Sequence, residues 1–338
     1  MASLLAGLSS SVGCSVRVPS SSTTLVTAPA STTETDSAAT SSPETATAAT
    51  SNANAQGTFA IIGDFGAGNE AELAVANLVA SHHPDFVITA GDNCYTTAGG
   101  IGTGRYDQSA GAYYSGWMKD ISTTGFRNPV GTAAINGFFP SLGNHDCEDT
   151  LTGAEDYLAY FDLPGSGIAN SSGNERYYDF VRGPVHFFAL NSNPEEPDGT
   201  SGTSVQARWL QRQLAASTST WNIVYFHHAP YSSDTYHGST PQMRWPFAAW
   251  GADGVISGHA HVYERIMRDG IVYFVNGLGG GDIYNFGNPV SGSVARYNSG
   301  WGAQIVTATD ATLDFEFFGT GGELVDSWRL WATPAPSN

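Results

Sequence analysis

Two histidines stand one residue apart in the segment Gly258-His259-Ala260-His261, directly after an apolar stretch from Gly254 to Ser257. Because side chains alternate along a strand, a strand continued through this segment would direct both imidazoles to one side. Imidazole nitrogens are common ligands of Zn, Fe and Mn ions. A lone His-x-His pair is more typical of surface histidines, so the rest of the chain must decide between these interpretations.

Four further segments repeat the same arrangement, in which a predicted apolar strand is followed at once by side chains that can bind metal. In chain order, the five sets are Asp64, Asp92 with Tyr95, Asn144 with His145, His227 with His228, and His259 with His261. Ligands gather at the carboxyl ends of strands in α/β sheets, so these distant residues can converge. Their number suits two ions of high coordination rather than one tetrahedral zinc, and the mixed donors favour Fe, Mn or Zn.

The five segments resemble the signatures of the calcineurin-like metallophosphoesterases. They read Gly63-Asp64-Phe65-Gly66, Gly91-Asp92-Asn93-Cys94-Tyr95, Gly143-Asn144-His145-Asp146, Val224-Tyr225-Phe226-His227 and Gly258-His259-Ala260-His261. Tyr95 and the extension Val262-Tyr263-Glu264-Arg265 are typical of the purple acid phosphatase branch. The resemblance runs from about Phe59 to Leu330, and the small, single-domain, tartrate-resistant type found in bacteria is the most similar form.

The resemblance implies a dinuclear centre with a defined division of ligands. Asp64, Tyr95 and His261 would bind Fe(III); Asn144, His227 and His259 would bind Fe(II), Zn(II) or Mn(II); Asp92 would bridge both ions. A metal-bound hydroxide would then hydrolyse phosphate monoesters, as in an acid phosphatase, with His145 as general acid or hydrogen-bond donor to the leaving group. The alternatives are a phosphodiesterase of the same superfamily and a non-catalytic binding protein that keeps the fold.

Several assignments stay open at this level. The Val-x-x-His spacing selects His227 as ligand and leaves His228 in the substrate pocket, although the spacing to Pro230 equally allows the reverse. His237 is either a second substrate-binding histidine or an exposed loop residue. Asp146 either orients His145 or serves as a turn residue.

Two pairs of residues raise structural questions of their own. Glu264 and Arg265 are expected to form an ion pair, and the alternative is a direct role of Arg265 in phosphate binding. Cys94 and Cys147 each follow a ligand motif and form either a disulfide or two free buried thiols.

Strands and helices alternate from Thr58, and antiparallel strands follow towards the end of the chain, which indicates an α/β architecture with more than one sheet. The resemblance specifies a four-layer αββα sandwich of two mixed β-sheets flanked by helices. Asn69 is expected to cap a helix with Glu72 reciprocating, and a β-hairpin is expected around Gly183-Pro184. The remaining predicted helices carry Val205 to Leu214, and Tyr113, Tyr114, Trp117, Met118 and Ile121.

Composition separates residues 1–56 from the catalytic domain predicted over residues 57–332. The first segment is rich in Ser, Thr and Ala, so we expect it to be disordered, with a targeting signal followed by a linker. The chain has a net charge of −18, which argues against nucleic-acid binding but allows a small phosphate ester held by metal. No apolar run approaches the ~20 residues of a membrane span. No protein partner is predicted, and the resemblance implies a secreted or periplasmic protein.

Overall fold

The computed structural model describes residues 56–95, 104–119, 131–147 and 154–332. The chain divides into two units, Met1–Thr50 and Ser51–Asn338, and the following account concerns the second. The predicted N-terminal segment lies outside the described residues, apart from Gln56. In the part of the chain that is described, every helix is too short or too polar to cross a membrane.

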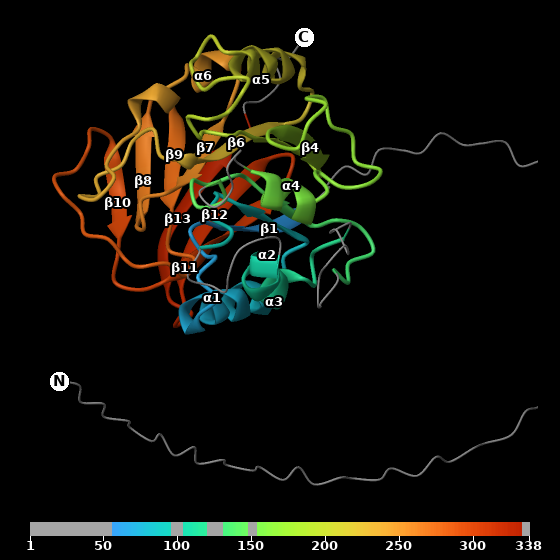
Figure 1. Cartoon of the computed structure of the whole chain (residues 1–338). Helices are drawn as coiled ribbons and strands as arrows, with labels where there is room; N and C mark the ends of the chain where they lie inside the picture. The colour runs from blue at the N-terminus through green and yellow to red at the C-terminus, as the bar shows by residue number, and fades with distance from the viewer. Residues whose placement is uncertain (1–55, 96–103, 120–130, 148–153, 333–338) are drawn as a thin grey trace, which may run out of the picture. The chain divides into compact units, whose positions relative to one another are not determined.

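Two mixed β-sheets form the centre of the domain (Figure 1). In the described part of the chain, the first sheet has six strands in the order β13-β12-β11-β1-β2-β3. Its strands are β1 (Gly57–Ile62), β2 (Phe86–Thr89), β3 (Phe138–Pro140), β11 (Gly302–Ala308), β12 (Thr312–Gly319) and β13 (Leu324–Trp331). Strands β1, β2 and β3 are parallel, whereas β11, β12 and β13 continue the sheet in antiparallel pairs.

The second sheet has seven strands among the described residues, in the order β10-β8-β9-β7-β6-β5-β4. Its strands are β4 (Tyr178–Arg182), β5 (Val185–Ala189), β6 (Trp221–His228), β7 (Gly254–Gly258), β8 (Tyr263–Arg268), β9 (Ile271–Asn276) and β10 (Ser293–Tyr297). The expected hairpin around Gly183-Pro184 is confirmed as the antiparallel pair β4-β5. Strands β5, β6, β7 and β9 are parallel to one another.

Helices cover the outer faces of both sheets. They are α1 (Glu70–Ser81), α2 (Gly104–Gln108), α3 (Ala110–Tyr114), α4 (Glu155–Tyr160), α5 (Val205–Ala216), α6 (Phe247–Trp250) and the 3₁₀ turn η2 (Pro241–Met243). In Figure 1, α1, α2 and α3 lie beyond the first sheet, and α5 and α6 lie beyond the second. The predicted four-layer αββα architecture is therefore confirmed.

Aromatic side chains fill the space between the sheets. Phe59 on β1 packs edge-on against Phe187 on β5, with ring centroids 5.0 Å apart. Tyr263 on β8 stacks on Phe317 of β12 at 4.0 Å. The strand residues Phe59 to Ile62 are all buried, as expected for a strand covered on both faces. This core fixes the relative position of the two sheets and therefore of the side chains at their ends.

One predicted helix is shorter than expected, and one predicted cap is confirmed. The helix carrying Tyr113 and Tyr114 ends at Tyr114, because Ser115 and Gly116 favour a turn; Ile121 lies outside the described residues. The Asn69 side chain accepts a hydrogen bond from the Glu72 backbone N–H at 2.9 Å. Glu72 reciprocates one residue earlier than in a regular capping box, by accepting from the backbone N–H of Gly68 at 2.6 Å.

Candidate metal centre

The candidate ligands follow the carboxyl ends of β1, β2 and β3, which are parallel in the first sheet, and of β6 and β7, which are parallel in the second. Strands β1, β2 and β3 lead to Asp64, Asp92 and Asn144, whereas β6 ends with His227 and His228, and β7 is followed by His259. Asp64, Asp92 and His259 all have left-handed backbone conformations, with φ angles of 56°, 53° and 68°. Such conformations are strained for residues with side chains and cluster at functional sites.

One group of donors contains Asp64, Tyr95 and His261. The Nε2 atom of His261 lies 3.1 Å from the Tyr95 hydroxyl oxygen and 3.3 Å from Oδ1 of Asp64. The Asp64 carboxylate also accepts the backbone N–H of His259, at 2.9 and 3.1 Å from its two oxygens. One carboxylate oxygen, one phenol oxygen and one imidazole nitrogen thus lie close together.

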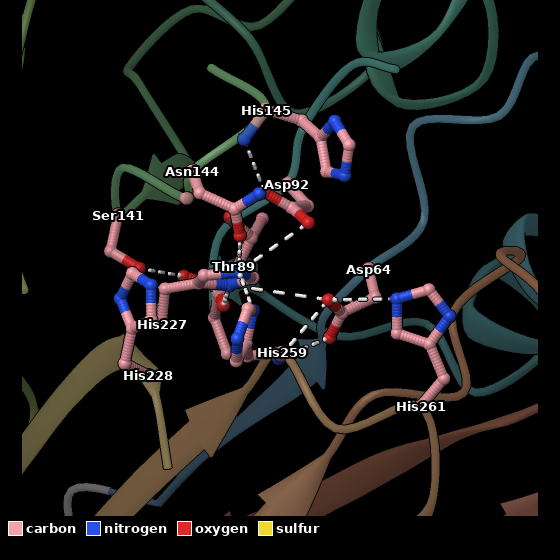
Figure 2. Close-up of polar contacts among 12 residues, drawn as sticks. Asp64, Thr89, Asp92, Ser141, Asn144, His145, His227, His228, His259 and His261 are labelled. Atoms are coloured by element: carbon pink, nitrogen blue, oxygen red, sulfur yellow. Dashed lines mark hydrogen bonds and ion pairs between the residues drawn. The ribbon is translucent and has the colours of Figure 1, made fainter. Parts of the chain in front are cut away.

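A second group contains Asn144, His227 and His259. The Nε2 atom of His227 lies 2.9 Å from Oδ1 of Asn144 and 3.1 Å from Nδ1 of His259. It also lies 3.4 Å from Oδ2 of Asp92. Figure 2 shows this group on one side of the cluster and Asp64 with His261 on the other.

Asp92 lies between the two groups. Donor atoms of Asp64, Asp92 and His227 are all within 4.8 Å of one another, and all these residues are buried. Most of these contacts fall within the two sets that the resemblance implies, and Asp92 lies close to a member of each set, Asp64 and His227.

Backbone carbonyls fix the orientation of two imidazoles. Nδ1 of His227 lies 2.8 Å from the carbonyl oxygen of Ala90, and Nδ1 of His261 lies 2.5 Å from that of Asp282. Because a carbonyl only accepts, each Nδ1 carries a proton, which leaves Nε2 of the neutral ring as a lone-pair donor facing the cluster. Metal-bound histidines are commonly held in this way.

The charge balance of the cluster also fits a cation. Burial alone would lower the pKa of His227, but the carboxylates of Asp92 and Asp64 raise it to about 9. A single proton on Nε2 cannot serve Asn144, His259 and Asp92 together, whereas a cation can be shared among several donors. The residues therefore fit bound metal, and metal binding would release this proton.

The predicted catalytic histidines surround the same cluster. The backbone N–H of His145 donates to Oδ1 of Asp92 at 3.0 Å, and its ring packs edge-on against Tyr95 at 4.6 Å between centroids. The rings of His228 and His237 lie 4.5 Å and 3.7 Å from the ring of His259. His237 is an exposed loop residue, and its ring stacks on that of the candidate ligand His259. Its role in substrate binding stays a prediction.

Ser192 contacts both the backbone and the ring of His228. The hydroxyl oxygen of Ser192 accepts the backbone N–H of His228 at 3.0 Å and lies 2.8 Å from Nδ1 of its ring. Burial and the neighbouring His227 lower the pKa of His228 to about 3, so the ring is neutral. If Ser192 donates to Nδ1, the ring proton is on Nε2 and is available to a bound substrate.

Asp146 holds two ligand loops together. Its buried carboxylate accepts from the backbone N–H of Gly143 at 2.8 Å, from Nδ2 of Asn93 at 2.9 Å and from the Tyr106 hydroxyl at 2.9 Å. Gly143 precedes Asn144 and Asn93 follows Asp92, so Asp146 connects the loops after β2 and β3. The structure therefore supports the turn-residue role of Asp146, and its predicted orienting role on His145 stays a prediction.

The expected ion pair between Glu264 and Arg265 is wrong. The Arg265 guanidinium donates to Asp326 on β13 at 2.7 and 2.9 Å, whereas buried Glu264 accepts from the backbone and hydroxyl of Ser233 at 2.7 and 2.5 Å. Neighbours on a strand point to opposite faces, which explains why the two side chains separate.

The two cysteines that follow ligand motifs are free thiols. Cys94 is buried and Cys147 half-buried, and neither forms a disulfide. The structure therefore confirms the free thiols and not the disulfide.

Sequence reasoning missed Ser192 and Tyr284. Tyr284 stacks on His261 with centroids 4.2 Å apart and an angle of 4° between the rings. Its position shortly after the Gly-rich segment Asn276 to Gly280, which also resembles the phosphatase family, is a signal that could have indicated it. Ser192 lies in a loop rich in polar residues, where nothing in the sequence distinguishes it.

Two mixed sheets with ligand-bearing loops at their strand ends define a metallophosphoesterase fold and site. Residues 57–263 match the sequence profile of the family described as calcineurin-like phosphoesterase. This chain belongs to that family.

The relatives of the chain include purple acid phosphatases. Purple acid phosphatase 23 of Arabidopsis thaliana is 25% identical over 232 residues, which cover 62% of this chain and 47% of that protein. The chain spans about half the length of these curated relatives: 47% of purple acid phosphatase 23 and 45% of purple acid phosphatase 15 from the same plant.

Solved structures share the fold. Purple acid phosphatase PPD1 from yellow lupin (Lupinus luteus) seeds has a TM-score of 0.62 at 16% identity, over 82% of this chain and 54% of that chain. GAP50, described as the anchor in the inner membrane complex of Plasmodium, has a TM-score of 0.62 at 17% identity, over 83% of this chain and 90% of that chain. Likeness at these identities concerns the fold alone.

Proposed function

We propose that this chain is a metal-dependent phosphomonoesterase, an acid phosphatase with a dinuclear centre of Fe(III) and Fe(II), Zn(II) or Mn(II). The observation that supports the proposal is the division of the donors into two groups around Asp92. The group with the Tyr95 phenol and the Asp64 carboxylate suits a hard trivalent ion. The group with Asn144, His227 and His259 offers neutral donors, which suit a divalent ion.

The chain's own residues would carry out the remaining steps. Bound cations would supply charge neutralisation of the phosphate and a lower pKa for an attacking water molecule. His228 and His237, beside His259, would donate hydrogen bonds to phosphate oxygens. His145 would donate a hydrogen bond or a proton to the departing oxygen of the ester.

Hydrolysis assays test the activity. Protein loaded with iron and zinc, or with iron and manganese, should hydrolyse 4-nitrophenyl phosphate faster than bis(4-nitrophenyl) phosphate. Faster diester hydrolysis would instead assign a phosphodiesterase of the same family. No turnover of either ester by fully metal-loaded protein would reject enzymatic function.

Metal analysis with a visible spectrum tests the centre. A tyrosinate-to-iron(III) band should vanish in Tyr95→Phe and in His261→Ala, whereas His259→Ala should mainly weaken binding of the second ion. Tyr297→Phe is the matched control, because its hydroxyl contacts Glu323 away from the centre, at 3.3 Å. A colourless, iron-free and fully active protein would contradict the iron assignment but not the phosphatase activity.

The secreted or periplasmic location is part of the same proposal. Fractionation of cells that express the full chain, followed by immunoblotting, should recover the protein outside the cytoplasm. Recovery in the cytoplasmic fraction alone would contradict it.

A further inference from the structure

Aromatic rings extend from the candidate metal centre to the surface of the protein. Tyr284 stacks on His261 at 4.2 Å, and His237 stacks on His259 at 3.7 Å. Tyr236 in turn packs against Tyr284 at 4.8 Å and against His237 at 4.7 Å. We name Tyr236, His237 and Tyr284 the aromatic rim. It contacts one histidine from each donor group, so it borders the whole centre.

The loop that carries Tyr236 and His237 is held by two buried carboxylates. Asp234 accepts the backbone N–H groups of Tyr236 at 2.8 Å, His237 at 2.9 Å and Gly238 at 2.8 Å. Its neighbour Ser233 is bound by buried Glu264. Charge-assisted hydrogen bonds of this kind are stronger than neutral ones. The backbone of the loop is therefore preorganised before any ligand arrives.

A second segment ties the same loop to Tyr284. The backbone N–H of Thr235 donates to the carbonyl of Asn285 at 2.9 Å, and Asp234 forms an isolated antiparallel bridge with Phe286. The two halves of the aromatic rim are thus fixed relative to each other, although distant in sequence. A preorganised surface loses little conformational entropy on binding.

Tyr236 distinguishes the aromatic rim from simple packing around the histidines. Tyr284 is half-buried, but the Tyr236 side chain is 72% exposed. An exposed aromatic ring beside a polar cluster offers a planar apolar surface to a ligand that binds there. Aromatic rings stack on planar groups of any kind, including aryl rings and nucleobases.

We propose that the aromatic rim binds the organic group of the substrate and selects phosphate esters whose organic group is a planar aromatic ring, aryl or nucleobase. This inference rests on the proposed phosphatase function of the same centre. The phosphate would face the donor groups, while the ring would contact Tyr236. The side chains of the aromatic rim are uncharged or weakly basic, so recognition depends on ring stacking rather than on a second charge.

Binding of two phosphonates tests the proposal without hydrolysis. Phenylphosphonate and methylphosphonate share the anionic group and differ in the ring. Isothermal titration of the metal-loaded full chain should show tighter binding of phenylphosphonate. Tyr236→Ala should reduce this preference about two- to tenfold, the effect of one aromatic pair, and leave methylphosphonate binding unchanged. Tyr236→Phe should keep the preference.

Trp331 provides the matched control. It is an aromatic residue that is 68% exposed on the edge strand β13, and Trp331→Ala should leave both affinities unchanged. An unchanged preference in Tyr236→Ala, or equal weakening of both phosphonates, would overturn the proposal. Equal weakening would mean that Tyr236 supports the metal centre instead of contacting the organic group.

Hydrolysis of phenyl phosphate and glycerol phosphate separates the two proposals. If the chain hydrolyses both but Tyr236→Ala leaves the phosphonate preference intact, the aromatic rim inference alone fails. If phenylphosphonate binds with a preference that depends on Tyr236 while neither ester is hydrolysed, the binding role stands and the phosphatase proposal fails.

Discussion

Replacing Glu72 with glutamine should remove a large part of the pH dependence of stability. Glu72 lies in the first turn of α1 with an exposed fraction of 0%. One carboxyl oxygen accepts the backbone N–H of Gly68 at 2.6 Å, and the other is buried without a hydrogen-bond partner. Burial raises the pKa of Glu72 from 4.5 to about 9, against the lowering effect of the Gly68 hydrogen bond. Folded protein therefore keeps this proton at neutral pH.

The size of the effect follows from proton linkage. A raised folded pKa gives stability that is complete below the unfolded pKa and is lost as pH rises towards the folded pKa. Between the two pKa values, the folded state holds one more proton than the unfolded state. The free energy of unfolding then falls by about 1.4 kcal/mol per pH unit, or about 3 kcal/mol from about pH 5.5 to about pH 7.5.

Urea unfolding at these two pH values provides the assay. Glu72→Gln should gain about 3 kcal/mol relative to the wild type between the lower and the higher pH. Glu70→Gln is the matched control, because Glu70 lies in the same turn but is exposed, and it should follow the wild type. If Glu72→Gln and the wild type show the same pH dependence, Glu72 is ionised in the folded protein and the reasoning is wrong.

Three further predictions concern the centre. Asp146→Ala should lower the free energy of unfolding by about 4 kcal/mol, because buried donors of Gly143, Asn93 and Tyr106 lose their acceptor. Asp146→Asn should lower the free energy of unfolding by a smaller amount. Equal losses for the two variants in urea unfolding would contradict this prediction. Gly91→Ala should weaken metal binding, because Gly91 has a φ of +85° and a Cβ there would lie 2.6 Å from Nδ1 of His227. The measurement is the metal content after dialysis, and full metal content would contradict the prediction. Removal of metal by a chelator should lower the midpoint of thermal unfolding, since buried carboxylates then lose their counter-charge, and added metal should restore it; an unchanged midpoint would speak against a bound cation.

Local sequence predicted the main elements because their signals depend on near neighbours. Apolar runs predicted the strands that precede Asp64 and Asp92, and the Asn69 cap predicted the start of α1. The helix after Ala110 was predicted too long, because its apolar spacing continues beyond Tyr114 while the chain turns. Here the turn at Ser115 and Gly116 prevailed over periodicity.

The histidine pair shows the limit of strand periodicity. Strand β7 ends at Gly258, and the left-handed conformation of His259 breaks the alternation that would have placed both rings on one side. His259 therefore joins His227, and His261 joins Tyr95 and Asp64. Backbone conformation in one residue thus decides which donor group each ring enters.

The sequence by itself determined which candidate donors stand at strand ends, because parallel strands bring their carboxyl ends to one edge wherever they lie in the chain. Only the tertiary structure decided the protonated nitrogen of His227, through the carbonyl of Ala90, and the partner of Glu264. It also placed Tyr236 and Tyr284 beside the centre. These contacts join residues far apart in the sequence and depend on the paths of loops, which local preferences of the chain do not specify.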